Sequence, residues 1–292
     1  MNVDAIWGQV LSGLSVGMVL FLIAAGLSVI FGTLKILNLA HGTIYMVSGF
    51  LCYWFTSTFA GIPGIFLITL VLAPVVTALL GGLIERFLLR RIYAEEMLYQ
   101  YILTFGLILI LGELCKLIWG VEYHTVPVPW PLDGKFIMLE MVYPMYNLFL
   151  ICCGIAVFIG LMSLMRFTGL GRIIRAVTFN REMANTLGIN VPRVYTGVFM
   201  LGCWLAGLAG TLMPPMSVVA LGTDMAVIID CFIIVVIGGM GSLPGAFIGA
   251  IILGLLNAFG ISILPKLTVA FGFILMIIVL VIRPWGLLGK PE

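Results

Sequence analysis

Four ionisable side chains lie within or beside long apolar stretches of the sequence, where a charged group is costly and needs a physical reason. They are His41, Glu113, Asp224 and Asp230. Ionisable groups inside a membrane segment commonly line ion pathways or relay protons, and a central aspartate costs on the order of 3 kcal/mol on insertion scales. Ion-coupled transport would therefore need at least one of these four groups to face a polar path.

Each of the four groups also has a structural interpretation. Glu113 precedes Lys116 by three residues, which predicts a local ion pair on one helix. Asp224 stands at a helix entrance, where the positive end of the helix dipole favours an acidic group. Asp230 lies about 9 Å farther along that helix, so it lines a path or makes a structural hydrogen bond. His41 has three candidate roles: hydrogen bonding at a helix start, lining of a path, and proton handling.

The sequence lacks the patterns of metal, nucleotide and enzyme sites. The six cysteines form no Cys-x-x-Cys pair, so we expect no metal site and no cofactor in this chain. A Gly-x-Gly-x-x-Gly pattern starting at Gly239 fails because Pro244 stands where the third glycine is needed. The two histidines, His41 and His124, belong to different segments, and no His-Glu-x-x-His is present. We therefore predict no catalytic residues, and a membrane enzyme is the weakest hypothesis.

The composition identifies the surroundings of these groups. Of the 292 residues, 63% are hydrophobic and 9% are charged, whereas soluble domains carry about 25% charged residues. A surface this poor in charge faces a lipid bilayer, so we predict an all-α integral membrane protein with a single domain over residues 1–292. Runs of roughly 20 apolar residues place the spans at about 9–31, 38–58, 62–84, 97–119, 143–165, 195–215, 225–240, 245–264 and 267–283.

The basic residues are distributed unevenly between these spans. With nine spans and an external amino terminus, 11 of the 14 lysines and arginines fall on the face that also holds the carboxyl terminus, and the positive-inside rule makes that face cytoplasmic. Eight spans with a broken or re-entrant segment is the close alternative, because polar residues interrupt the second and seventh spans. Residues 120–142 then form an outer loop and residues 166–194 an inner one. The 11 residues are Lys35, Arg86, Arg90, Arg91, Arg166, Arg172, Arg175, Arg181, Arg193, Arg283 and Lys290.

Small residues recur four apart in several spans, and this spacing predicts close helix–helix contacts. Gly13 and Gly17 show it in the first span. Further instances are Gly202, Ala206 and Gly210, and then Gly241, Gly245 and Gly249.

The inner segment contains a pattern that could hold an ATP-hydrolysing partner. We predict a short helix of about three turns there, whose small residues let it press into a groove on an ATPase while its arginines orient it. The residues concerned are Arg172, Arg175 and Ala176, followed by Glu182, Ala184 and Gly188, which fit the coupling motif E-A-A-x-x-x-G with Met183 in place of the first alanine. An ordinary basic loop is the alternative interpretation.

Several segments in order resemble the permease subunits of branched-chain amino-acid ABC importers. Together they cover nearly the whole chain, so jointly they are specific although each alone is weak. They are Gly26 to Gly32, Asn38-Leu39-Ala40-His41-Gly42, Gly171-Arg172 to Gly188-Ile189, Gly238 to Ser242 with Gly245-Ala246, and Arg283-Pro284-Trp285-Gly286 to Gly289.

The resemblance implies a transport subunit rather than an enzyme, in a bacterial inner membrane and without a nucleic-acid partner. Its partners would be a second homologous permease, two cytoplasmic ATP-binding subunits that use the ATP, and an external solute-binding protein. Coupling to the ATPases would pass through the 171–189 segment, and transport would proceed by alternating access. An ion-coupled secondary transporter is the runner-up hypothesis.

The chain departs from the family pattern in one respect. The family often has Lys-Ala-Phe where this sequence reads Asp230-Cys231-Phe232, and an acidic residue of the following helix corresponds to Asn257. The solute therefore stays open between branched-chain or other hydrophobic amino acids and related small solutes such as urea, short amides or aromatic acids. The candidate path residues are Asn38, His41, Asp230 and Asn257.

Overall fold

The computed structural model describes residues 3–93, 95–138 and 141–289 of the chain. Lys290, which enters the count of basic residues above, lies outside these ranges. Within them, six helices are long and apolar enough to cross a membrane. They are α1 (Val3–Leu34), α3 (Ile65–Phe87), α4 (Met97–Trp119), α5 (Met145–Phe167), α8 (Val191–Leu212) and α10 (Leu243–Ile263).

Three shorter apolar helices complete the bundle: α2 (His41–Thr58), α9 (Thr223–Gly238) and α11 (Thr268–Ile282). Two helices lie outside it, α6 (Gly169–Phe179) and α7 (Arg181–Thr186), and two 3₁₀ turns connect helices, η1 (Leu89–Ile92) and η2 (Pro265–Leu267). The molecule is therefore a mainly helical integral membrane protein, as the composition predicts.

The all-α prediction is wrong for the 120–142 segment. It contains β1 (Lys135–Met138), which pairs antiparallel with β2 (Met141–Pro144). Phe136, Ile137, Val142 and Tyr143 supply the aromatic and β-branched residues that favour strands. The same segment also makes a bridge between His124 and Val219, which follows α8.

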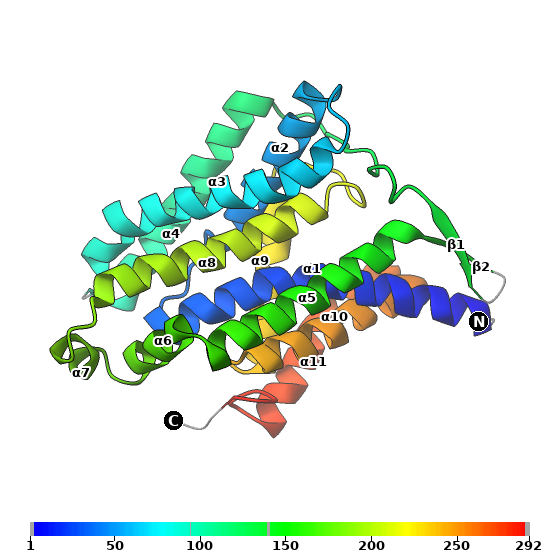
Figure 1. Cartoon of the computed structure of the whole chain (residues 1–292). Coiled ribbons are helices and arrows are strands. Elements are labelled where there is room, and N and C mark those ends of the chain that lie inside the picture. The colour runs from blue at the N-terminus through cyan, green and yellow to red at the C-terminus, as the bar shows by residue number, and fades with distance from the viewer. Residues whose placement is uncertain (1–2, 94, 139–140, 290–292) are drawn as a thin grey trace.

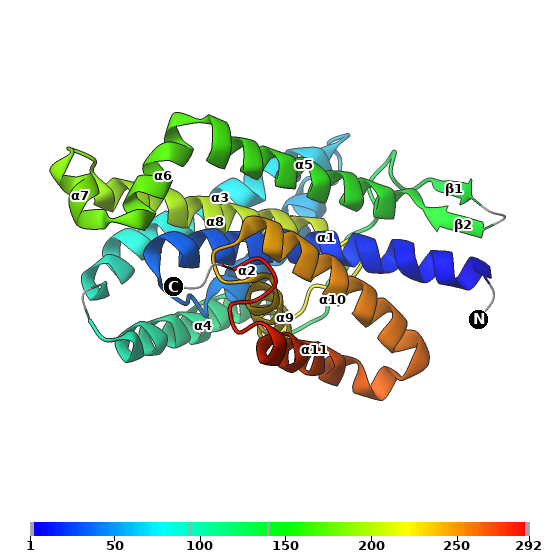
Figure 2. The same cartoon turned by 90° about the horizontal axis from the view of Figure 1, so that it is seen from below.

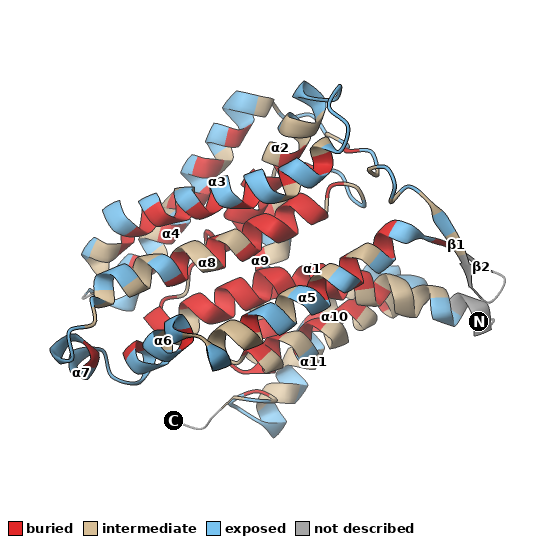
Figure 3. Cartoon of the chain, in the orientation of Figure 1, coloured by how far each residue is buried: buried red, intermediate tan, exposed pale blue. Residues whose placement is uncertain are grey.

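Helix α1 forms the centre of the bundle, and nearly every side chain from Met18 to Ile30 is buried (Figure 3). Helix α10 crosses it closely, because Gly13 faces the backbone of Gly254 and Gly17 faces that of Ala250. Figure 2 shows α5 on one side of α1 and α4 with α11 on the other. Backbone approach at small residues stabilises helix pairs in lipid, where the hydrophobic effect contributes little.

Helix α8 joins α1 to the α2–α3 layer. Gly202 packs against Ile30 of α1, and Gly210 packs against the backbone of Tyr45 in α2. The hydroxyl of Ser48 donates to the carbonyl of Gly207 at 2.6 Å. The contacts predicted from Gly202 and Gly210 are therefore confirmed, although the two glycines face different helices.

The two ends of the bundle differ in character (Figure 1). The start of α1 and the β1–β2 hairpin lie at one end, whereas α6, α7 and the end of α1 lie at the other. The α6–α7 end also holds η1, since Arg90 of η1 bonds to Pro192 at the start of α8.

The predicted second and seventh spans begin inside the bundle rather than at its surface. His41, the first residue of α2, bonds to Ile23 of α1, which lies about 17 Å along α1 from its end at Leu34. Gly42 in turn faces the backbone of Asp224 in the first turn of α9. Both helices are therefore partial, and we call the place where their amino-terminal ends meet the helix junction.

Candidate functional site

The helix junction surrounds the carboxylate of Asp224. The hydroxyl of Thr43 in α2 donates to Oδ2 of Asp224 at 2.9 Å, and both side chains are buried. Asp224 and Thr43 each lie in the first turn of their helix, so the carboxylate is near the positive ends of two helix dipoles. Half-helices whose amino termini meet inside a bundle form ion and solute sites in transporters.

His41 connects the start of α2 to α1 by a hydrogen bond, and Asn38 stabilises the turn that precedes α2. His41 Nε2 lies 3.1 Å from the carbonyl oxygen of Ile23, which can only accept, so Nε2 carries the proton. The side-chain oxygen Oδ1 of Asn38 accepts from the backbone N–H of Ala40 at 3.1 Å. Nδ1 of His41 and Nδ2 of Asn38 are buried and find no partner within the described residues. The local turn thus retains unused hydrogen-bonding capacity next to the junction.

Asp230 lies apart from this group. Asp224 and Ile228 face α2, and Asp230 is about 200° around α9 from Ile228. Its carboxylate is half-buried and has no hydrogen bond or ion pair with the described residues. The structure therefore does not bring Asp230 together with Asn38 and His41.

Asn257 lies on α10, half-buried, about one turn from the level of Asp230. The α9–α10 pair is antiparallel, with Gly238 facing Gly245 and Ile234 facing Gly249. Continuing that register places Asp230 beside residue 253 and Asn257 beside residue 226. In this register Asp230 and Asn257 lie about one helical turn apart along the α9–α10 interface.

A small pocket lies between α2 and the start of α9, and Asp230 is not among its lining residues. It measures about 170 Å³ and is bordered by Tyr45, Gly49, Thr223, Ala226 and Val227, among others. Thr223, Ala226, Val227 and Asp230 follow the spacing of a single helix face. A cavity of about 150 Å³ accepts a benzene ring, so this pocket fits one compact apolar group.

The predicted packing glycines divide between a helix and a turn. Gly245 and Gly249 lie in α10 against α9, whereas Gly241 lies before α10 with φ of 83° and faces Gly32 of α1. The three glycines therefore do not share one helix face.

The coupling segment folds as two short helices that begin at side-chain caps. Thr168 caps α6 by accepting from Gly171, Asn180 caps α7 by accepting from Met183, and Asn190 caps α8 by accepting from Arg193. A cap of this kind contributes about 1 kcal/mol. The sharp turns between the helices are thus fixed by residue type.

Helices α6 and α7 expose both charge and apolar surface. The predicted residues Arg172, Arg175, Ala176 and Glu182 are exposed, and Phe179 and Leu187 are 90% and 75% exposed. Large apolar side chains among arginines at the end of a bundle form a typical protein-docking surface.

The predicted helical face through Ala184 and Gly188 is wrong. Helix α7 ends at Thr186, and Gly188 follows it with φ of 82° and nothing near the position of a Cβ. Ala184 is buried and its carbonyl accepts from Ile189. Gly188 therefore serves a left-handed turn that ends the helix, a role for which glycine is favoured.

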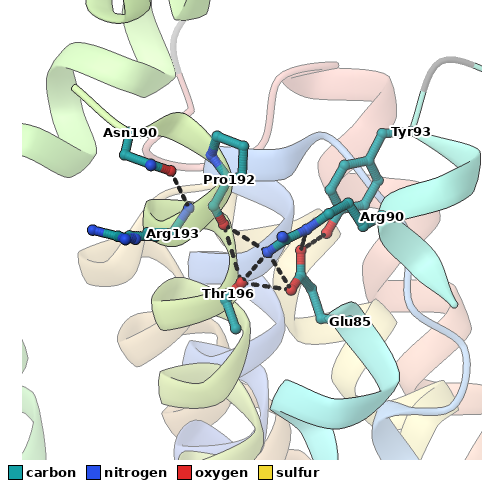
Figure 4. A network of polar contacts seen from close by, with 7 residues as sticks. All are labelled: Glu85, Arg90, Tyr93, Asn190, Pro192, Arg193 and Thr196. Atoms are coloured by element: carbon teal, nitrogen blue, oxygen red, sulfur yellow. Dashed lines mark hydrogen bonds and ion pairs between the residues drawn. The ribbon is translucent and has the colours of Figure 1, made fainter. Parts of the chain in front are cut away.

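A polar cluster at the same end ties α3 and η1 to the start of α8, and Figure 4 shows it from close by. Glu85 in the last turn of α3 has no exposed surface. Its carboxylate forms an ion pair with Arg90 at 3.3 Å and accepts from Tyr93 at 2.8 Å and from Thr196 at 2.7 Å. Arg90 also donates to the carbonyl of Pro192 and to Thr196. We call these four side chains, Glu85, Arg90, Tyr93 and Thr196, the Glu85 clamp.

The environment of Tyr93 keeps its phenol protonated. Burial, with the hydrogen bond to Glu85, raises the pKa of the Tyr93 phenol far above its usual range. The phenol therefore remains a donor to the carboxylate at every physiological pH.

Sequence reasoning missed the clamp as a site. It counted Arg90 as one of several basic loop residues and did not consider Glu85, Tyr93 or Thr196. The available signal was an acidic residue directly before three arginines at the end of an apolar span, since a buried carboxylate there needs a partner. The Glu113–Lys116 pair, in contrast, is confirmed at 3.2 Å on the surface of α4.

The molecule combines helices of spanning length with two half-helices that meet inside the bundle and a polar pair of helices at one end. This architecture is that of a multi-pass membrane transport protein. A family model described as "Branched-chain amino acid transport system / permease component" matches residues 9–280, and the chain belongs to this family. It is accordingly a multi-pass inner-membrane protein.

Relatives match along almost the whole chain. The high-affinity branched-chain amino acid transport system permease protein BraD of Pseudomonas aeruginosa is 30% identical over 97% of this chain and 96% of its own length. The corresponding permease LivH of Escherichia coli is 29% identical over the same shares. A probable branched-chain amino acid transport permease LivH of Methanocaldococcus jannaschii is 27% identical over 92% of this chain and 88% of its own. No solved structure matches the chain.

Proposed function

We propose that this chain is one membrane-spanning subunit of an ATP-driven importer for a small solute, and that it couples to ATPase subunits through α6 and α7. The observation that carries the proposal is the exposed arginine and aromatic surface of α6–α7 at one end of a lipid-facing bundle. A membrane face would not favour Arg172 and Arg175, and water would not favour Phe179. A protein partner accommodates both kinds of side chain.

The proposed orientation puts the α6–α7 end in the cytoplasm and the amino terminus outside. The support is that the arginines of η1, α6 and α7 gather at this end, opposite the β1–β2 hairpin. Basic residues in short loops remain on the cytoplasmic side. On this basis the hairpin and the rest of the 120–142 segment are available to an external solute-binding protein.

The proposed path runs along the half-helices α2 and α9. Asn38 and His41 contribute the junction side of it, and Asp230 with Asn257 the α9–α10 side. The pocket of about 170 Å³ at Thr223, Ala226 and Val227 would take an apolar group of the solute. Because BraD and LivH are named for branched-chain amino acids, we propose an amino acid with a small apolar side chain as the solute.

The proposed assembly contains a second homologous permease, two ATPases and the solute-binding protein. Two features of this chain support the proposal. Helices α6 and α7 offer a docking surface for an ATPase, and the sequence itself contains no nucleotide-binding motif. ATP would therefore be hydrolysed by the partners, and movement of α6–α7 would be passed to α8 and α3 through the Glu85 clamp.

The test is reconstitution into liposomes with and without the partner ATPases. We expect solute uptake only when ATPases, ATP and the binding protein are all present. Phe179→Ala should weaken ATPase association at least tenfold, as loss of a large buried interface side chain does. Phe105→Ala is the matched control, because Phe105 is an exposed aromatic residue on α4, away from α6–α7.

Two outcomes would contradict the proposal. Uptake driven by an ion gradient through this chain alone would establish an ion-coupled transporter. Equal ATPase association by the Phe179 and Phe105 variants would remove α6–α7 as the coupling surface.

A further inference from the structure

A second pocket, larger than the first, lies at the α6–α7 end of the bundle. It measures about 500 Å³, within the range of small-molecule sites. Its walls come from the end of α1, the end of α5, one face of α6, the turn from Met240 to Ser242 with the first residues of α10, and Leu288 with Gly289. It is separate from the path proposed above, whose pocket is lined by α2 and α9.

The lining of this pocket is positively charged. Arg175 of α6 and Lys35 at the end of α1 line it, and none of the described residues that border it is acidic. The Arg175 guanidinium forms no hydrogen bond or ion pair with the part of the chain that the structure describes. An arginine that lines a pocket without a carboxylate partner is suited to an anion from outside the chain.

Ser28 supplies an independent indication. It is 1% exposed, lines the pocket, and its hydroxyl has no hydrogen-bond partner within the described residues. A serine inside a helix ordinarily bonds to the carbonyl four residues earlier. Other serines of the bundle do find partners, as Ser15 does at the carbonyl of Ser12. The Ser28 hydroxyl is therefore an unused donor in the wall of a cationic pocket.

Helix α10 begins at the same pocket. Ser242 caps it by accepting from Gly245 at 3.2 Å, and Leu243 and Pro244 border the pocket. The positive end of this 21-residue helix therefore adds to the charge of Arg175.

We propose that this pocket binds a phosphate group through Arg175, Ser28 and the start of α10. The planar guanidinium matches phosphate oxygens in pairs, and the hydroxyl supplies a further donor. A bound phosphate would link α6 to α1 and α10, and so would restrain the helix proposed above to couple to the ATPases. Two sources supply this chemistry: a phospholipid headgroup of the inner leaflet, or free phosphate and its esters.

The test uses the full-length chain in micelles of an uncharged sugar detergent, which contains no phosphate. Binding of radiolabelled inorganic phosphate is measured by equilibrium dialysis. We expect Ser28→Ala to weaken binding about tenfold and Arg175→Gln by at least as much, because each removes a bond to a charged group. Ser15→Ala is the matched control and should bind as the wild type does, since Ser15 is a buried serine of the same helix away from the pocket.

A second arm identifies the source of the phosphate. Phosphatidylglycerol is added to the micelles, and native mass spectrometry counts the lipids that remain bound. A lipid retained by the wild type and by Ser15→Ala, but lost from Ser28→Ala, identifies a headgroup; phosphate binding without lipid retention identifies a soluble ligand.

The proposal is overturned if neither probe binds the wild type. It is also overturned if binding is unchanged in both the Ser28 and Arg175 variants. Folding is checked by the unfolding temperature in phosphate-free buffer, which Ser28→Ala should not lower because the hydroxyl it removes has no partner among the described residues.

Discussion

The helix junction and the Glu85 clamp join distant segments in opposite ways. At the junction, among the residues that the structure describes, a single side-chain hydrogen bond, from Thr43 to Asp224, connects α2 to α9. At the clamp, one carboxylate with no exposed surface is held by an arginine of η1, a phenol from the turn after η1 and a hydroxyl of α8. A junction with one such bond separates readily, whereas a fully satisfied network moves as a unit. If the chain works by the alternating access that the family resemblance implies, the junction is the part expected to open and the clamp the part expected to move as a unit.

The largest expected effect comes from breaking the clamp. Glu85→Ala leaves Arg90, Tyr93 and Thr196 without their common partner. Breaking a fully buried ion pair costs about 3–5 kcal/mol, and because the Arg90 side chain is 35% exposed we expect the lower end of that range. The unfolding temperature in detergent should fall sharply, and transport should be lost with it. Glu113→Ala is the control: its ion pair with Lys116 is exposed, and such pairs contribute about 0–1 kcal/mol. Similar losses in both variants would show that the clamp is not a rigid unit.

The clamp also shows where sequence reasoning reached its limit. Apolar runs predicted the helices, because the thickness of the bilayer fixes the length of a spanning helix. Small residues four apart predicted several helix–helix contacts, because they allow two backbones to approach closely. Glu85 and Thr196 are 111 residues apart, and no local pattern joins them. The pairing depends on how α3 and α8 pack, which the sequence of either helix does not contain.

A smaller effect is expected from crowding the junction. Gly42→Ala places a methyl group against the backbone of Asp224, and overpacking of this kind costs about 1–3 kcal/mol. The half-helices would be forced apart, so uptake should fall more than ATPase association does. Gly106→Ala on α4 is the matched control, because nothing lies within 4 Å of its added Cβ. Unchanged uptake in Gly42→Ala would contradict a moving junction.

The junction was only partly predictable. Polar residues at 38–42 correctly marked the start of the second span as irregular, whereas α9 runs without a break through Asp230, which was taken to interrupt the seventh span. The meeting of Gly42 with Asp224 depends on both helices starting inside the bundle, which a hydropathy pattern cannot distinguish from a short span. Asp224 was accordingly predicted as a helix-entrance residue, and its bond to Thr43 was missed.

Loss of the single junction bond should have a more modest consequence. Thr43→Val keeps the shape of the side chain and removes the donor to Asp224, and a hydrogen bond to a charged group contributes about 1.5–3 kcal/mol at most. The two helix dipoles would still stabilise the Asp224 carboxylate in this variant, so the measured loss of stability should be near the lower end of that range. Thr56→Val on the same helix is the control, since its hydroxyl bonds only within α2. If the two variants unfold at the same temperature, the bond does not hold the junction.

A change in the coupling segment should affect stability less than either site. Gly188→Ala forces a Cβ into a left-handed residue, at a cost of about 1–2 kcal/mol that local rearrangement of α7 can reduce. Because nothing lies near that Cβ, the effect should appear as weaker ATPase association rather than unfolding. Gly169→Ala, in α6 with an ordinary φ and equally open surroundings, should associate normally. If both variants associate equally with the ATPase, the turn at Gly188 has no role in coupling.

The smallest effect on stability is expected at Asp230, where the effect on transport decides its role. The carboxylate bonds to none of the described residues, so Asp230→Asn removes charge without breaking a contact. The unfolding temperature should therefore change little, while the uptake rate changes if the charge faces the solute beside the pocket at Ala226 and Val227. A solute with an ammonium group should lose most, since its attraction to the carboxylate disappears. A fall in unfolding temperature with normal uptake would instead make Asp230 structural and would confine the path to the junction.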